Sequence, residues 1–211
     1  MNPLPGSGLV RSYEPINIYV SMELGNPGFD RGVVDATYAI DGKNGNYTGE
    51  LRQGTLMAQI TTSKLWVPCK RTRVNGAVSS SESIVVDDAR AFKVGDTITI
   101  GATSGLTITA VDYDNDEITV DSDAVDAADN AVVIASGALA GAETCRGVLD
   151  EHVDLYDVNT RANVDRAAGR IVTSNAKINT AALLGDLDSC RASGVTNYLS
   201  HLQFYTNGVQ V

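Results

Sequence analysis

Three kinds of residue in this 211-residue chain could support chemistry: closely spaced aspartates, two histidines and three cysteines. In the run Asp112-Tyr-Asp-Asn-Asp-Glu117, Asp112, Asp114 and Asp116 alternate as carboxylates do in the first half of an EF-hand calcium loop. That loop requires glycine at its sixth position and a bidentate glutamate at its twelfth, where this chain has Glu117 and Asp123. Because strand-like residues flank the run, we interpret it as an acidic hairpin turn and keep the three aspartates as a candidate for weak calcium binding.

The histidines offer no recognisable catalytic arrangement. His152 stands among Asp150, Glu151 and Asp154, but neighbouring residues of a strand point to opposite faces, so these groups should not converge on a metal ion. His201 has no acidic residue near it in the sequence. No Gly-x-Ser-x-Gly, phosphate-binding glycine loop or His-Glu-x-x-His motif occurs. We therefore expect neither an enzyme nor a bound cofactor.

Cys69, Cys145 and Cys190 are far apart in the sequence and form no Cys-x-x-Cys pair. Such cysteines are expected to be buried, free thiols. Cys69 and Cys145 flank the acidic segment described next, so they could be neighbours in space, and a disulfide between them remains open.

Net charge divides the chain into two parts. Residues 75–142 carry 12 acidic and 2 basic side chains, whereas the rest has 14 of each, so the formal charge of −10 belongs to this segment. An acidic chain without clustered lysine and arginine does not suit nucleic acid. No run reaches the ~20 apolar residues of a membrane helix, and the first residues lack a secretory pattern, so we expect synthesis in the cytoplasm of the producing cell.

Residues 75–142 read as a separate small β-barrel or sandwich inserted into a host domain. Five short runs rich in β-branched residues are separated by turn-forming residues. They are residues 84–86, 97–100, 106–111, 117–120 and 131–134. Linker-like stretches at 76–81 and 137–142 should join the insert to the host.

The host should comprise residues 29–74 and 143–211 and be mainly β, with one or two short helices. Residues 179–184 resemble a capped helix that Gly185 could end, and residues 193–204 hold a second helical candidate. The only tryptophan, Trp66, is expected to anchor the core, with an interface role as the alternative.

Residues 1–28 read as an extended arm, because four of the five prolines lie here and proline disfavours helices and central strands. Within it, the alternating run from 16 to 22 looks like a single strand that adds to a partner. Its apolar positions are Ile16, Ile18, Val20 and Met22.

With the insert removed, three host segments appear in an order similar to that of the head decoration proteins of lambda-like tailed bacteriophages. Gly54-Thr-Leu followed by Ile60-Thr-Thr-Ser-Lys-Leu-Trp-Val-Pro68 resembles their GT-(V/L)-L…IT…GK-(Y/W)-VP stretch. Gly147-Val-Leu-Asp-Glu-His-Val-Asp154 resembles their GVLLEDVD stretch, and residues 170–183 resemble the strand, turn and LNxAAL that follow. The chain departs from the pattern in carrying the insert and in having Lys64-Leu-Trp in place of Gly-Lys-aromatic.

This resemblance implies a compact, β-clip-like protomer that forms a homotrimer on the outer surface of an expanded capsid. There it would bind the major capsid protein through its N-terminal arm, stabilise the shell and perform no catalysis. The alternative is an adhesion module displayed on the capsid, whose insert binds a ligand on the host cell surface.

Overall fold

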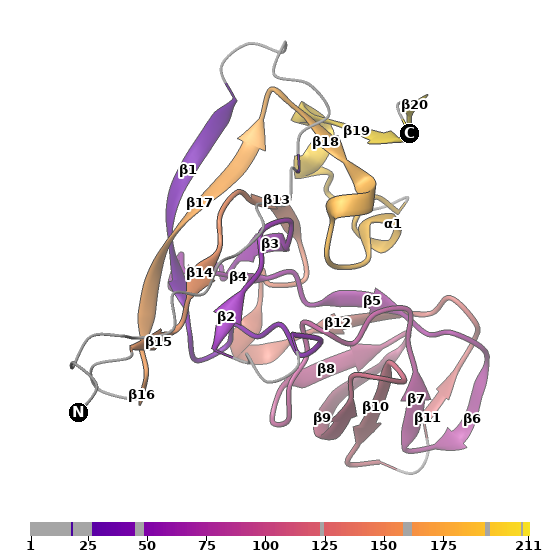
Figure 1. Ribbon diagram of the computed structural model, residues 1–211. Helices are drawn as coiled ribbons and strands as arrows, with labels where there is room; N and C mark the ends of the chain where they lie inside the picture. Colours follow the sequence, from indigo (N-terminus) through magenta and orange to yellow (C-terminus); the bar gives the residue numbers. More distant parts are fainter. Residues whose placement is uncertain are drawn as a thin grey trace, which may run out of the picture.

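The computed structural model describes residues 18, 27–44, 49–122, 125–157, 162–192, 195–207 and 209–211. The protein is mainly β, as the sequence predicts, and has one short α-helix in the described part. Two β units lie side by side: the host, built from both ends of the chain, and the insert (Figure 1). None of the described helices is long and apolar enough to cross a membrane.

The host is built around a closed five-stranded barrel. Its strands, in spatial order, are β1 (Gly28–Asp35), β17 (Arg166–Ser174), β13 (Cys145–Leu149), β3 (Leu56–Gln59) and β4 (Trp66–Pro68). Antiparallel pairing joins these neighbours except at the closure, where β1 meets β4 through a single parallel pair, Val34 and Trp66. The barrel therefore closes at one point, and the rest of the outer edge of β1 has no partner among the described strands.

Smaller elements surround the barrel. A parallel pair, β18 (Ala176–Asn179) and β19 (Leu202–Thr206), extended by β20 (Val209–Gln210), covers one side together with the helix α1 (Leu187–Cys190) (Figure 1). The remaining host elements are β2 (Glu50–Leu51), β14 (Val153–Asp154), β15 (Tyr156–Asp157) and β16 (Ala162–Asn163), with 3-10 turns at Gly137–Leu139, Thr180–Ala182 and Tyr198–His201.

All five β runs expected in the insert form strands. Its six-stranded sheet has the order β5 (Arg71–Arg73), β12 (Val132–Ala135), β8 (Thr97–Ile100), β9 (Thr103–Asp112), β10 (Glu117–Val120) and β7 (Ser83–Val85). A bridge between Val74 and Val86 joins the two ends of this sheet, and backbone hydrogen bonds flank it. The sheet thus curls around its own apolar core, which includes Phe92 and Ile98, and forms a small barrel.

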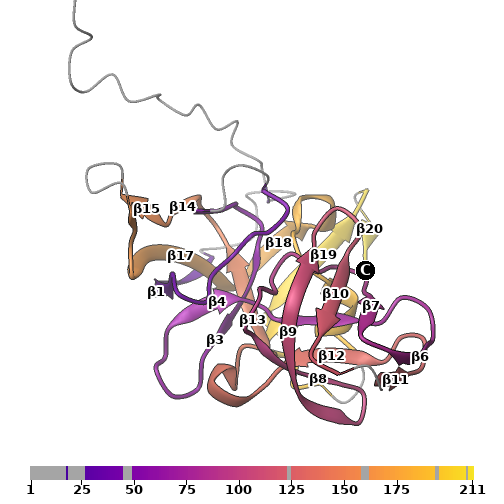
Figure 2. The same ribbon diagram turned by 90° about the horizontal axis from the view of Figure 1, so that it is seen from below.

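The two expected linkers are structured. Residues 78–81 form β6 (Val78–Ser81), which pairs with β11 (Val125–Ala127) at the end of the insert farthest from the host (Figure 2). At the other linker, Leu139 and Ala142 are buried against Ile60 and Val67 of the host. Glycine and serine gave these stretches the composition of linkers, but pairing and apolar burial in the folded protein override composition.

The boundary of the insert also differs from the expected one. Strand β5, which the sequence division leaves in the host, pairs with β12 of the insert. Thr72 and Val74 alternate inward, so this short strand has the period of an insert strand although its arginines look like surface residues. The chain therefore leaves the host at about Lys70 and returns near Ala135, where the Ala135 N–H donates to the Lys70 carbonyl at 3.1 Å.

The helical expectations are met only in part. Asn179 caps a turn as expected, its side chain accepting a hydrogen bond from Ala181 N–H, but this turn is a 3-10 turn of three residues. In the second candidate, Tyr198–His201 is a 3-10 turn, and the chain then continues as β19. Leu202 and Phe204 alternate into the core, and pairing with β18 gives this segment a strand conformation.

Candidate functional site

The acidic run from Asp112 forms the turn of the β9–β10 hairpin, as predicted. The Asp112 carboxylate accepts hydrogen bonds from the side chain and backbone of Asn115 and from Asp114 N–H, and these bonds lower its pKa. Asp116 instead accepts from Ala89 N–H at 2.8 Å and pairs with Lys43 of the host at 2.5 Å. The candidate calcium ligands Asp112, Asp114 and Asp116 thus hold the turn and dock it, and they do not form a convergent ligand group within the described residues.

Tyr113 in the same turn extends this docking. Its ring packs against Gly42 of the host so closely that a methyl group on Gly42 would lie 2.1 Å from the ring. Its hydroxyl donates to the Phe92 carbonyl at 2.8 Å. Burial, together with the charge of Asp96, raises the pKa of Tyr113 to about 12. The hairpin turn is therefore a contact between insert and host.

The two histidines lie apart. His152 is partly buried, and burial lowers its pKa, while His201 is exposed on a 3-10 turn. Trp66, by contrast, is 3% exposed and packs in the barrel core with Val34 and Met57. Its side chain is therefore part of the barrel core.

Of the four arm residues, Ile16, Val20 and Met22 lie outside the described residues. Ile18 is fully buried in the host core beside Leu56 and Val148, and its carbonyl accepts a hydrogen bond from Asn179 N–H at 2.8 Å. In this structure Ile18 is part of the core and does not face outward as a partner-binding residue. The alternation of apolar and polar residues from 16 to 22 predicted a strand that pairs with another protein, but the same pattern is also compatible with packing onto the host.

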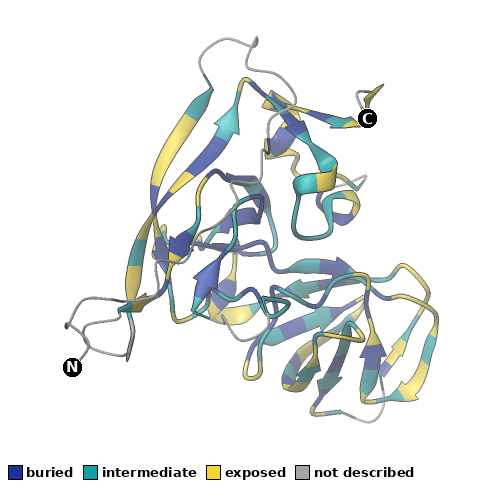
Figure 3. Ribbon diagram, viewed as in Figure 1, coloured by how far each residue is buried: buried dark blue, intermediate teal, exposed yellow. Residues whose placement is uncertain are grey.

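Much of β1 is exposed (Figure 3), and its outer face carries two exposed apolar side chains. Phe29 and Val33 are 44% and 43% exposed, and the Arg170 guanidinium lies 5.1 Å from the centre of the Phe29 ring. Between residues 28 and 33 the backbone edge of β1 has no strand partner in the described part of the chain. Exposed apolar side chains beside an unpaired strand edge make a surface suited to strand addition.

An enclosed ion pair lies where the insert joins the host. Lys70 Nζ donates to Asp96 Oδ2 and to the Ala91 carbonyl, both at 2.6 Å, and neither charged side chain is more than 1% exposed. Burial lowers the pKa of Lys70, and the charge of Asp96 partly offsets this. The second oxygen of Asp96 has no hydrogen-bond partner within the described residues. This pair ties the chain crossing to the insert.

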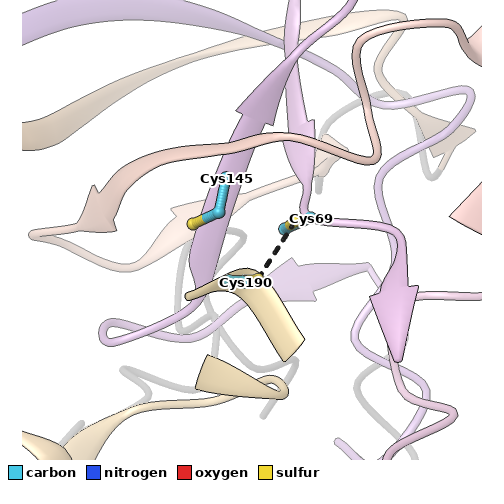
Figure 4. Close-up of side chains that lie close together, drawn as sticks. All are labelled: Cys69, Cys145 and Cys190. Carbon is cyan, nitrogen blue, oxygen red and sulfur yellow. Dashed lines mark hydrogen bonds between the residues drawn. The ribbon is translucent and has the colours of Figure 1, made fainter. Parts of the chain in front are cut away.

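The three cysteines converge in the host core at the same junction (Figure 4). Cys69 follows β4, Cys145 begins β13 and Cys190 ends α1, and all three are buried and free. Their sulfur atoms lie within 4.8 Å of one another, with 3.6 Å between those of Cys69 and Cys190. The sequence suggested that Cys69 and Cys145 could be neighbours. It did not predict that Cys190 lies beside them, because only the tertiary fold brings α1 next to β4 and β13.

Hydrogen bonds among the thiols separate their acidities. Bonds with Cys145 raise the pKa values of Cys69 and Cys190. Burial opposes ionisation of Cys145, but hydrogen bonds from the other two sulfurs outweigh burial and lower its pKa.

Helix α1 is held in place from both ends. The Asp186 side chain caps it by accepting from Ser189 N–H at 2.8 Å, and it also pairs with Arg73 at 3.3 Å. Arg71 Nε donates to the Ser189 carbonyl at 3.0 Å and also to its hydroxyl oxygen. Two arginines of β5 therefore fix the element that carries Cys190.

Comparison with protein-family models and with curated protein sequences found no match for this chain.

Proposed function

We propose that this chain is a structural virion protein that binds the outside of an expanded phage capsid as a trimer and stabilises the shell by bridging capsomers. The observation that carries the proposal is the placement of the segments that resemble decoration proteins. They are separated by the insert in sequence, yet they contribute β3, β4, β13 and β17, which are neighbouring strands of one barrel. The resemblance therefore covers one continuous structural unit.

The β1 surface supports attachment by strand pairing. The arm leads directly into β1, so a segment that pairs with a capsid protein would be covalently joined to an edge that can itself pair. Three such arms on a trimer would bind multivalently, and modest affinity per arm would then give lasting attachment. Because the trimer would bind the assembled lattice and not separated subunits, binding would stabilise the shell.

The position of the insert is consistent with this arrangement. In both ribbon views it lies away from β1, on the other side of the barrel (Figures 1 and 2). With β1 against its partners, the acidic insert would face solvent, where its charge would keep particles mutually repulsive.

A direct test mixes the purified protein with expanded capsids that lack decoration and measures bound copies and the temperature at which the particles fall apart. We expect saturable binding in multiples of three and a higher disruption temperature. Absence of saturable binding would contradict the proposal.

A truncation of the N-terminal arm provides a second test, and the burial of Ile18 determines where the chain should be cut. Removing residues 1–15 keeps Ile18 in the core, so the protein should fold but lose capsid binding. The matched control is Ile18→Ala in the full-length chain, which should lower stability by about 2–5 kcal/mol through the cavity it leaves. Because that control retains the rest of the arm, it should still bind capsids below its melting temperature.

The alternative function, an adhesion module, is favoured by the insert's separate core. If this is the function, the protein should bind intact host cells, and this binding should depend on the insert while capsid binding does not.

A further inference from the structure

We propose that Cys69, Cys145 and Cys190 bind one thiophilic d10 metal ion, such as Zn(II) or Cu(I), as a three-thiolate site. These are all the cysteines of the chain, and they come from three segments between 45 and 121 residues apart that the fold brings to one point. Each offers one sulfur atom, and among the described residues this is the only group of three or more potential ligands that are close together.

The spacing of the sulfur atoms suits such an ion. A Zn–S bond is about 2.3 Å, so two sulfurs bound to one ion lie roughly 3.8–4.0 Å apart. The three sulfurs here lie within 4.8 Å of one another, and those of Cys69 and Cys190 are 3.6 Å apart. A disulfide would require about 2.05 Å and would join only two of the three. Small side-chain rotations would therefore place all three around one ion.

The surroundings select the kind of ion. Thiolates favour soft ions such as Cu(I) and Zn(II), whereas calcium and magnesium require oxygen ligands. The cysteines are 2–6% exposed, and no carboxylate or imidazole joins their group within the described residues. Three-coordinate Cu(I) fits this set as it stands, while Zn(II) would add one further donor, such as a water or a backbone carbonyl.

Binding requires no change of oxidation state. Each thiol that becomes a ligand releases its proton to solvent, up to three per ion, and the sulfur lone pair forms the bond to the metal. The thiolate charge is then offset by the ion. Because the cysteines are buried, the ion would enter during folding or when α1 opens.

The site would connect parts of the chain that separate most easily. Cys69 directly precedes the point at which the chain leaves the host, Cys145 begins the first barrel strand after the chain returns, and Cys190 lies on a helix of four residues. A helix this short has little stability of its own. One ion would therefore join α1 to the host segments that precede and follow the insert in the sequence.

The test refolds reduced, full-length protein in Zn(II) and in Cu(I) separately, removes loosely bound metal with a weak chelator, and measures metal content by native mass spectrometry. We expect one ion per chain, up to three protons released, and three thiols protected from a thiol reagent. With free metal at a hundredfold excess over Kd, the melting temperature should rise by about 5–10 °C. Cd(II) should produce a sulfur-to-metal charge-transfer band.

Two variants distinguish loss of the metal site from a general loss of stability. Cys190→Ala should lose the ion and the charge-transfer band. Val172→Ala removes volume from the same core cluster but leaves all three thiols, so it should melt at a lower temperature and still bind one ion. If Cys190→Ala does not fold, the metal content, thiol protection and charge-transfer band of the wild-type chain decide the question.

Three results would overturn the proposal. One is that neither metal is retained, and another is that Cys190→Ala retains the ion as well as the wild type does. The third is that air oxidation reduces the thiol count from three to one in protein that binds no metal, which would identify a disulfide pair instead.

Discussion

Single residues at the junction determine whether the insert and the host stay together. Lys70 and Asp96 are the clearest case, because each is a buried charge whose partner comes from the other side of the junction. A buried ion pair adds little net stability over apolar residues, but breaking it leaves an unpaired charge out of water. The pair therefore acts mainly by penalising separation.

We expect Asp96→Asn to lower the free energy of unfolding by about 3–5 kcal/mol, because Lys70 would remain charged and buried. The double variant Lys70→Met, Asp96→Asn should lose clearly less than Asp96→Asn alone, since no unpaired charge remains. Urea unfolding of the wild type, both single variants and the double variant gives the coupling energy. Additive losses would show that the two charges do not depend on each other.

Tyr113 gives the junction a dependence on alkaline pH. Its pKa is about 12 in the folded protein, above the usual value of 10, so between these values the folded state holds a proton that the unfolded state has lost. Its contribution to stability is therefore fully present below pH 10 and is lost as pH rises toward 12. In unfolding experiments at pH 9, 10 and 11, stability should fall less steeply for Tyr113→Phe than for the wild type. Equal slopes would contradict this prediction.

At the scale of elements, the sequence predicted strands well wherever local residues dominate. The runs at 97–100 and 117–120 match strands β8 and β10, because β-branched residues alternate there between clear turns. Prediction from the sequence was wrong where tertiary contacts determine the conformation. Residues 78–81 are a strand only because β11 pairs with them, and Cys190 joins Cys69 only because β5 positions α1.

Helix α1 should depend strongly on its cap. We expect Asp186→Ala to lower the free energy of unfolding by about 1–2 kcal/mol, because Ser189 N–H and Arg73 both lose a partner. The control is Asn197→Ala, which removes the cap of the 3-10 turn at Tyr198–His201 without touching α1. Chemical denaturation measures the stability of both variants. The reactivity of the Cys190 thiol should rise in Asp186→Ala and stay unchanged in Asn197→Ala. Unchanged thiol reactivity in Asp186→Ala would show that the cap does not hold α1 closed.

The β1 edge allows a test of association. Val33→Lys should change the free energy of unfolding by no more than about 0.5 kcal/mol, because the side chain is exposed. It should nevertheless abolish binding to expanded capsids, since a lysine on an edge strand blocks further pairing. Val85→Lys is the matched control, with 40% exposure on the insert. Cosedimentation with expanded capsids gives the bound copies, and undiminished binding of Val33→Lys would exclude this edge as the attachment surface.

For the whole molecule, the hydrogen bond between Ala135 and Lys70 means that the host ends left by removing the insert are already adjacent. Replacing residues 71–134 by a short glycine linker should therefore leave a folded host. In this shortened chain Lys70→Met should leave the melting temperature nearly unchanged, because Asp96 and the Ala91 carbonyl, which enclose the ammonium group, leave with the insert and water can reach it. Thermal unfolding of the two variants checks this, and a melting temperature several degrees higher with Lys70→Met would contradict it.

The contact of Tyr113 with Gly42 has a consequence for imaging. The insert is held at the chain crossings and again, through this contact and the pair of Lys43 with Asp116, at its hairpin turn. A body held at separate points cannot swivel about one of them. On capsids decorated as proposed, averaged electron micrographs should therefore show the insert as sharply as the barrel. Gly42→Val, which the ring of Tyr113 cannot accommodate, should blur the insert alone.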